Sequence, residues 1–183
     1  MPTETTPRLL SVEPLPGYEP TIGRWIWVLE DTRRETKDEA LSGLDPAALD
    51  WIPPHIENSI GTLLYHIALI EMDWLYTDVL ESAPLPDELR PLFALDARDA
   101  QEHLSAIRGE TLEEHLRRLD LVREHLLATF QGMTLDEFRR PRSLPQYRVT
   151  PEWVLQHLIQ HEGEHRGHIQ LLRELAEGAL RAE

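Results

Sequence analysis

The chain has 183 residues and a net charge of −15, because 33 acidic side chains outnumber 18 basic ones. This charge opposes binding to phosphate backbones and to anionic lipids, so it argues against nucleic-acid and membrane partners. The sequence contains no cysteine, which excludes disulfides, a thiolate nucleophile and cysteine-ligated metal, so any metal would be held by nitrogen and oxygen atoms.

The first segment, residues 1–20, is rich in proline and has no long apolar run. We interpret it as an irregular N-terminal extension that precedes a single domain at residues 21–183. The segment has the features of neither a signal peptide nor a membrane span, so we expect the protein to be cytoplasmic.

Four later segments show helical periodicity, with apolar residues recurring at i, i+3, i+4 and i+7. They are residues 21–42, 57–81, 111–130 and 150–178. The third opens with the capping box Thr111 and Glu114, and the fourth opens with Thr150 as N-cap. No convincing run of alternating β-branched residues lies between them. The pattern predicts an all-α fold, a four-helix bundle with long crossover connections, in which the stretch 96–107 is a candidate short helix.

The fourth segment carries an unusual cluster of histidines in the window HLIQHEGEHRGH, residues 157–168. At 100° per residue, five polar side chains share an arc of roughly 100° with apolar residues of core type. These side chains are His157, His161, Glu164, His165 and His168. Buried imidazoles without partners cost on the order of 1–3 kcal/mol each. A divalent cation would satisfy them, since neutral imidazole is a common metal ligand.

Two histidines four residues apart on a helix can both reach one metal, whereas histidines on three successive turns cannot all reach it. His161 and His165 form such a pair, and the third ligand should come from a facing helix. His66 is the best candidate, because Leu63 and Ile70 place it on the apolar side of the second segment. His157 and His168 are then expected to support a ligand or a water molecule. Of the remaining four histidines, His103, His115 and His125 are expected at the surface, and His55 is not assigned a role.

Residues 161–165 also match the HExxH pattern of zinc proteases, with Glu162 as nominal general base. The extended pattern HExxHxxGxxH fails, because Arg166, Gly167 and His168 follow. No sheet is predicted that could bind an extended peptide. The sequence therefore argues against a protease.

The stretches NSIGTLLYHIALIEMDWL (58–75) and VLQHLIQHEGEHRGHIQLL (154–172) resemble the DinB/YfiT-like superfamily of metal-dependent bundle proteins. The resemblance implies a metal held by His66, His161 and His165. It also implies chemistry with low-molecular-weight thiols such as mycothiol or bacillithiol, since relatives include transferases and isomerases. The chain departs from the family at His168, where glutamine is frequent, and in its N-terminal extension.

Three histidine ligands leave coordination positions open, as in a catalytic metal site. We therefore expect a metal-dependent enzyme that acts on a small molecule, either a thiol-dependent transferase or a hydrolase. Zinc, nickel and iron all suit imidazole ligands. Glu162 and Glu164 are both candidate general bases. The alternative is a non-catalytic metal-binding or stress-associated module that has a structural or interaction role.

A partner subunit is also expected. Trp25 and Trp27 lie about 200° apart on the first helix, so they cannot face the same core. One of them should meet either a second copy of the chain or the N-terminal extension. We predict a homodimer.

Overall fold

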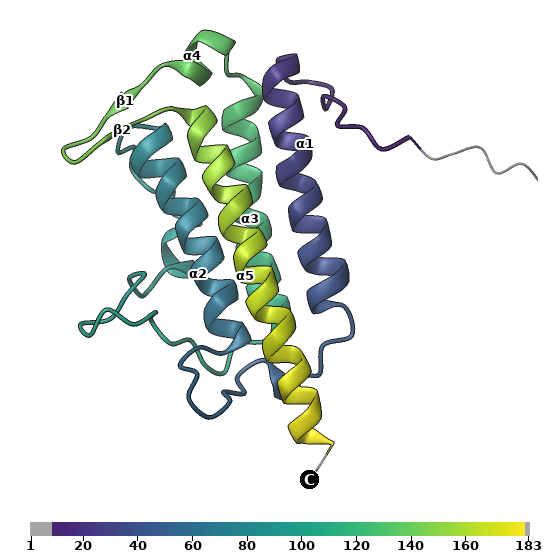
Figure 1. Ribbon diagram of the computed structural model, residues 1–183. Helices are drawn as coiled ribbons and strands as arrows, with labels where there is room; N and C mark the ends of the chain where they lie inside the picture. The colour runs from purple at the N-terminus through teal and green to yellow at the C-terminus, as the bar shows by residue number, and fades with distance from the viewer. Residues whose placement is uncertain (1–8, 182–183) are drawn as a thin grey trace, which may run out of the picture.

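The computed structural model describes residues 9–181, in which four long helices lie side by side (Figure 1). They are α1 (Pro20–Glu35), α2 (Ile60–Asp73), α3 (Leu112–Gln131) and α5 (Pro151–Leu180). The helices α1 and α2 continue through π-helical turns at Thr36–Leu41 and Trp74–Val79. The predicted mainly-α bundle is confirmed. Part of the predicted extension at residues 1–20 lies outside the described residues, and the remainder is not helical before Pro20.

The sequence sets the helix starts through side-chain caps. The Ser59 hydroxyl accepts a hydrogen bond from the Thr62 amide (3.1 Å) at the start of α2. The predicted capping box of Thr111 and Glu114 is present at α3. Thr150 accepts from the Trp153 amide (3.2 Å) at α5. Each cap satisfies an amide that the first helical turn leaves without a partner.

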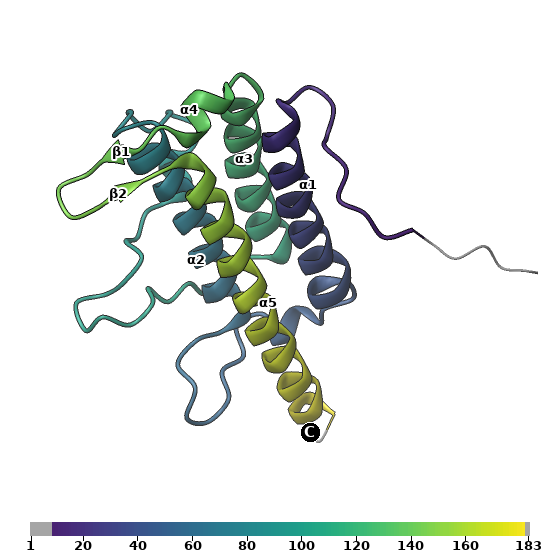
Figure 2. The same cartoon turned by 45° about the horizontal axis from the view of Figure 1, so that its top comes forward.

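The helices α2 and α3 run in the same direction, so the connection 80–111 returns along the length of the bundle (Figures 1 and 2). This is a predicted crossover connection. The prediction of a short helix at 96–107 is wrong. This stretch is irregular and has an isolated β-bridge between Arg98 and Leu104. The Asp99 carboxylate accepts from the amides of Gln101 (2.8 Å) and His103 (3.0 Å), which stabilises a turn in place of a helix.

Two small elements between α3 and α5 were not predicted. They are the helix α4 (Leu135–Arg139) and an antiparallel hairpin of β1 (Arg142–Ser143) and β2 (Arg148–Val149). Strands of two residues are too short to show an alternating pattern. Within residues 9–181, no helix is long and apolar enough to cross a membrane.

A layer of charged residues lies at mid-height in the core, between its two larger apolar clusters. Each of the four long helices contributes one buried residue to it, and these are Arg33, Glu71, Arg123 and Glu162. Arg33 contacts Glu71 (2.9 Å) and Glu162 (2.7 Å). Arg123 contacts the same two carboxylates at 2.7 Å and 3.1 Å. The layer therefore ties all four helices together.

The tryptophans of α1 have different surroundings. Trp25 packs against the core, and its Nε1 donates to Glu152 (3.3 Å). Trp27 lines a surface hollow with Leu9, Leu10 and other residues, so it lies beside the described part of the N-terminal segment. The homodimer stays a prediction.

Candidate metal centre

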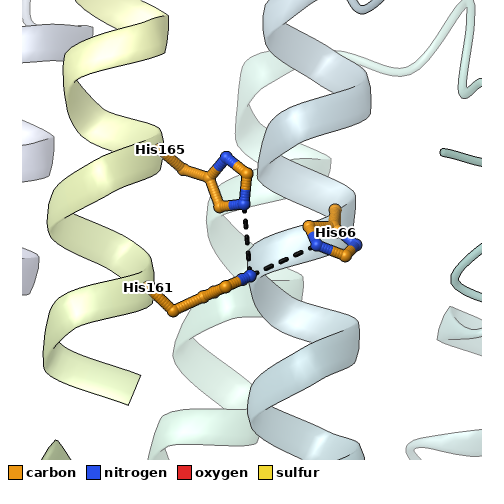
Figure 3. Close-up of side chains that lie close together, drawn as sticks. All are labelled: His66, His161 and His165. Carbon is orange, nitrogen blue, oxygen red and sulfur yellow. Dashed lines mark hydrogen bonds between the residues drawn. The ribbon is translucent and has the colours of Figure 1, made fainter. Parts of the chain in front are cut away.

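Three histidines converge where α2 faces α5 (Figure 3). His66 lies on α2, and His161 and His165 lie one turn apart on α5. The Nε2 atom of His161 is 3.2 Å from that of His66 and 3.1 Å from that of His165. One ligand atom from each ring lies within 4.8 Å of the others. Metal–nitrogen bonds of about 2.0–2.1 Å at tetrahedral angles separate nitrogens by roughly 3.4 Å, close to the two short distances here.

The three rings are kept neutral by their surroundings. Burial lowers the pKa of His66 to about 4 and that of His161 to about 3, with further lowering from neighbouring histidines. Burial also lowers the pKa of His165. Arg98, on the crossover connection, adds to the effect at His66. Neutral imidazoles are the form that binds metal.

The contacts among the rings are better explained by a cation than by hydrogen bonds alone. The Nε2 atom of His161 faces two other Nε2 atoms, yet one ring nitrogen carries either a proton or a lone pair. It therefore cannot make both contacts as full hydrogen bonds. The donor set thus fits a divalent metal. The Nδ1 atom of His66 is buried without a partner in residues 9–181, so this ring has no supporting acceptor of the usual kind.

The two expected supporting histidines flank the trio of His66, His161 and His165. The His157 ring lies 5.8 Å from that of His161, and it stacks on Trp153 at 5.1 Å. His168 is exposed, and its Nδ1 atom is 3.5 Å from the Nδ1 atom of His165. Both rings are therefore neighbours of the trio, and their supporting role stays a prediction.

The two candidate bases lie apart from the trio. The Glu162 carboxylate is buried against Arg33 and Arg123, which hold its pKa below the usual range although burial opposes its charge. Glu164 is exposed and accepts from the Gln160 side chain (2.8 Å). Within the described residues, no hydrogen bond joins either glutamate to the three histidines. Glu162 lies on the buried face of α5. The three-histidine site lies at the edge of that face, where α5 meets α2.

One histidine expected at the surface is buried. His115 is 1% exposed, and its Nδ1 atom contacts the Arg118 guanidinium (3.2 Å). Its neighbours include Glu110, whose carboxylate lies 3.5 Å from the same ring nitrogen. The expectation was wrong because His115 faces the start of α2: its Nε2 atom would lie 3.1 Å from a Cβ atom added at Gly61. His103 is exposed, as expected, and His125 is partly covered by Tyr76.

Comparison with known proteins gives a family and a distant relative. The family described as Mycothiol-S-transferase matches residues 28–178, a range that contains all three converging histidines. A Bacillus subtilis (strain 168) protein described as uncharacterized protein YkkA is 23% identical over 117 residues. That match covers 64% of this chain and 66% of the relative, slightly less than two thirds of its length.

Proposed function

Because the chain belongs to the mycothiol-S-transferase family, within the DinB/YfiT-like superfamily, we propose that it is a metal-dependent transferase. The reaction joins a low-molecular-weight thiol to an electrophilic small molecule. The observation that carries this proposal is the convergence of three neutral imidazoles at the boundary between α2 and α5. His161 and His165 are only partly buried there, so small molecules can approach the site from one side.

His66, His161 and His165 would hold the cation, for which zinc, nickel and iron are suitable. When bound, such a cation would lower the pKa of a thiol and favour the nucleophilic thiolate. The three rings contribute by keeping their lone pairs free and converging on one point. Arg98 is a cation near His66, so it would favour a negative charge such as a thiolate at this site.

The proposed reaction exchanges one bond for another. The sulfur of the thiol forms a bond to an electrophilic carbon, and the leaving group departs with the electrons of its own bond. The thiol proton must be removed, and Glu164 is the remaining candidate to accept it, because its carboxylate is exposed. Glu162 is unsuited to this task, since both of its oxygens contact arginines.

The proposal is tested first by the metal content of the purified protein. Wild type should hold close to one equivalent of divalent metal, and His66→Ala and His161→Ala at least about tenfold less. His103→Ala is the control, because His103 is exposed and its ring lies near Glu57 and Asp99. Equal and negligible metal in wild type and both site variants would refute the metal centre.

Turnover is then measured with mycothiol as the thiol and monobromobimane as the electrophile, following formation of the conjugate. We expect conjugation by wild type and its loss in His66→Ala. Equal rates in the two proteins would refute the proposal. Metal binding that raises thermal stability without any turnover would favour the non-catalytic module. Conversion of the electrophile by water, with no thiol present, would favour a hydrolase.

A further inference from the structure

An aromatic hollow lies at the N-terminal end of α5, and the His157 ring separates it from the three histidines. Its volume is about 400 Å³, and its walls come from the C-terminal end of α2, from β2 and from the first turn of α5. The aromatic walls are Trp74, Tyr147 and Trp153. The ring of Trp74 lies 5.3 Å from Trp153 and 6.0 Å from Tyr147. Trp153 is 47% exposed and Tyr147 is 43% exposed, so large aromatic surfaces remain open to solvent.

The hollow is held in shape without a ligand. The Tyr147 hydroxyl donates a hydrogen bond to the buried Asp78 carboxylate (2.8 Å), which fixes the ring at the edge of the hairpin. Burial and this carboxylate raise the pKa of Tyr147 to about 12, so the hydroxyl keeps its proton. A preformed site loses less entropy when it binds a ligand, and exposed aromatic surface commonly marks such sites.

A single ring connects the hollow to the metal centre. His157 stacks on Trp153 with an angle of 8° between the planes, and it packs against Trp74 at 4.8 Å. On its other side it neighbours His161 at 5.8 Å. The His157 ring would therefore separate a small molecule in the hollow from the three histidines, where a thiol would react.

The edge of the hollow carries a positive charge. Arg148 lines it, is exposed, and makes no ion pair or side-chain hydrogen bond that involves another residue in 9–181. The nearby carboxylates are engaged: Asp78 binds Tyr147, and Asp73 accepts from Thr77 (2.8 Å). This guanidinium is free to pair with an acidic group on a ligand.

We propose that the hollow formed by Trp74, Tyr147, Trp153 and Arg148 binds the electrophilic substrate through a flat aromatic body that carries an acidic group. The identification of this ligand as a substrate rests on the proposed function, but binding to the hollow can be tested without turnover. Stacking on the exposed rings favours flat molecules over saturated ones of similar size.

The test uses 2-naphthoate on metal-free protein in the absence of thiol. The five tryptophans give five indole N–H signals in a two-dimensional ¹⁵N NMR spectrum, assigned by single Trp→Phe variants. We expect saturable shifts of the Trp74 and Trp153 signals and none for Trp27 or Trp51. Decahydro-2-naphthoate, which has the same carbon skeleton without aromatic rings, should bind at least about tenfold more weakly. No saturable shift with naphthoate, or equal affinity for both acids, would overturn the proposal.

Variants separate the contributions of ring and charge. Trp153→Leu should weaken naphthoate binding about tenfold, whereas Trp153→Phe should retain most of it and Trp27→Leu all of it. Arg148→Gln should remove the preference for naphthoate over neutral 2-naphthalenemethanol. Unchanged affinity in Trp153→Leu would overturn the stacking site, and an unchanged preference in Arg148→Gln would overturn the assigned charge pairing.

Turnover links the hollow to the substrate. With metal and mycothiol present, the ratio of kcat/KM for 4-chloro-3,5-dinitrobenzoate over that for iodoacetamide should fall about tenfold in Trp153→Leu. An unchanged ratio would overturn the substrate assignment. If wild type converts monobromobimane but neither of these compounds, the substrate assignment is overturned. If wild type does not convert monobromobimane either, the proposed function fails, and the NMR titration still decides whether the hollow binds aromatic acids.

Discussion

Substitution of Glu162 by glutamine tests whether this residue stabilises the bundle or acts as a base. Glu162 is 1% exposed, and its oxygens accept from Arg33 (2.7 Å) and Arg123 (3.1 Å). With Glu71, these residues form a buried layer of two positive and two negative charges. Glu162→Gln leaves two buried arginines facing one buried carboxylate, Glu71.

The expected loss follows from that charge count. Breaking a buried ion pair by removing one partner costs about 3–5 kcal/mol. Glutamine keeps one oxygen that can accept from an arginine, so we expect the lower end, about 3 kcal/mol. A domain of ordinary stability, about 5–15 kcal/mol, would remain folded. With a urea m-value near the upper end of about 1–3 kcal/mol/M, the midpoint should fall by about 1 M.

The assay is urea unfolding followed by far-ultraviolet circular dichroism on metal-free protein. Glu30→Gln is the matched control, because Glu30 contacts the same Arg123 (2.7 Å) but is 39% exposed. It should cost less than about 1 kcal/mol. A Glu162→Gln midpoint equal to that of Glu30→Gln would refute the structural role. Normal stability together with abolished turnover would restore Glu162 as the base.

Four further outcomes are expected. Removal of metal by a chelator should lower thermal stability by about 2.7 kcal/mol at a metal concentration of 100 Kd, as measured by scanning calorimetry, and should leave His66→Ala unaffected. Tyr65→Phe should speed proteolysis of the connection 94–108, because the Tyr65 hydroxyl donates to the Leu95 carbonyl (2.8 Å) and accepts from its amide (3.0 Å). Thr150→Ala should cost about 1 kcal/mol in urea unfolding through loss of the α5 cap. Burial lowers the pKa of His115 below the usual 6.5. Below about pH 6.5, the unfolded chain therefore binds a proton at this histidine that the folded chain does not bind. Metal-free wild type should therefore lose more stability than His115→Gln between about pH 7.5 and about pH 5.5.

The helices and the converging histidines follow from local patterns. Capping residues such as Ser59 and Thr150 act within one turn, and an i, i+4 pair such as His161 and His165 is already local in sequence. The third member, His66, could be chosen because it lies on the apolar side of α2. Each of these signals depends on helix geometry alone, so it can be recognised without knowledge of the tertiary contacts.

The hairpin and the course of the crossover connection depend on contacts distant in sequence. Tyr147 reaches Asp78, and Tyr65 binds the backbone of Leu95. Neither pair has a signature in its own segment. The aromatic hollow was missed for this reason, since its walls come from three elements that only the fold brings together.

The charged layer did leave a signal that the sequence interpretation overlooked. Arg33 follows Ile22, Ile26 and Leu29 at helical spacing, so it occupies a core position, and Glu162 follows Leu155 and Leu158 in the same way. A charge at a core position needs an opposite charge nearby. Four helices with two such arginines and two such glutamates predict a shared network.

The layer and the metal centre both constrain α2 and α5 at the same height. Glu162 is adjacent in sequence to His161, and Glu71 lies five residues beyond His66. The arginines join the two carboxylates from inside the core, while the histidines meet at the outer edge of the same boundary between α2 and α5. A shift of one helix by a single residue, about 1.5 Å, would break the ion pairs and separate the Nε2 atoms together. The layer therefore fixes the register on which the histidine trio depends, so Glu162→Gln should weaken metal affinity, whereas Glu30→Gln should not.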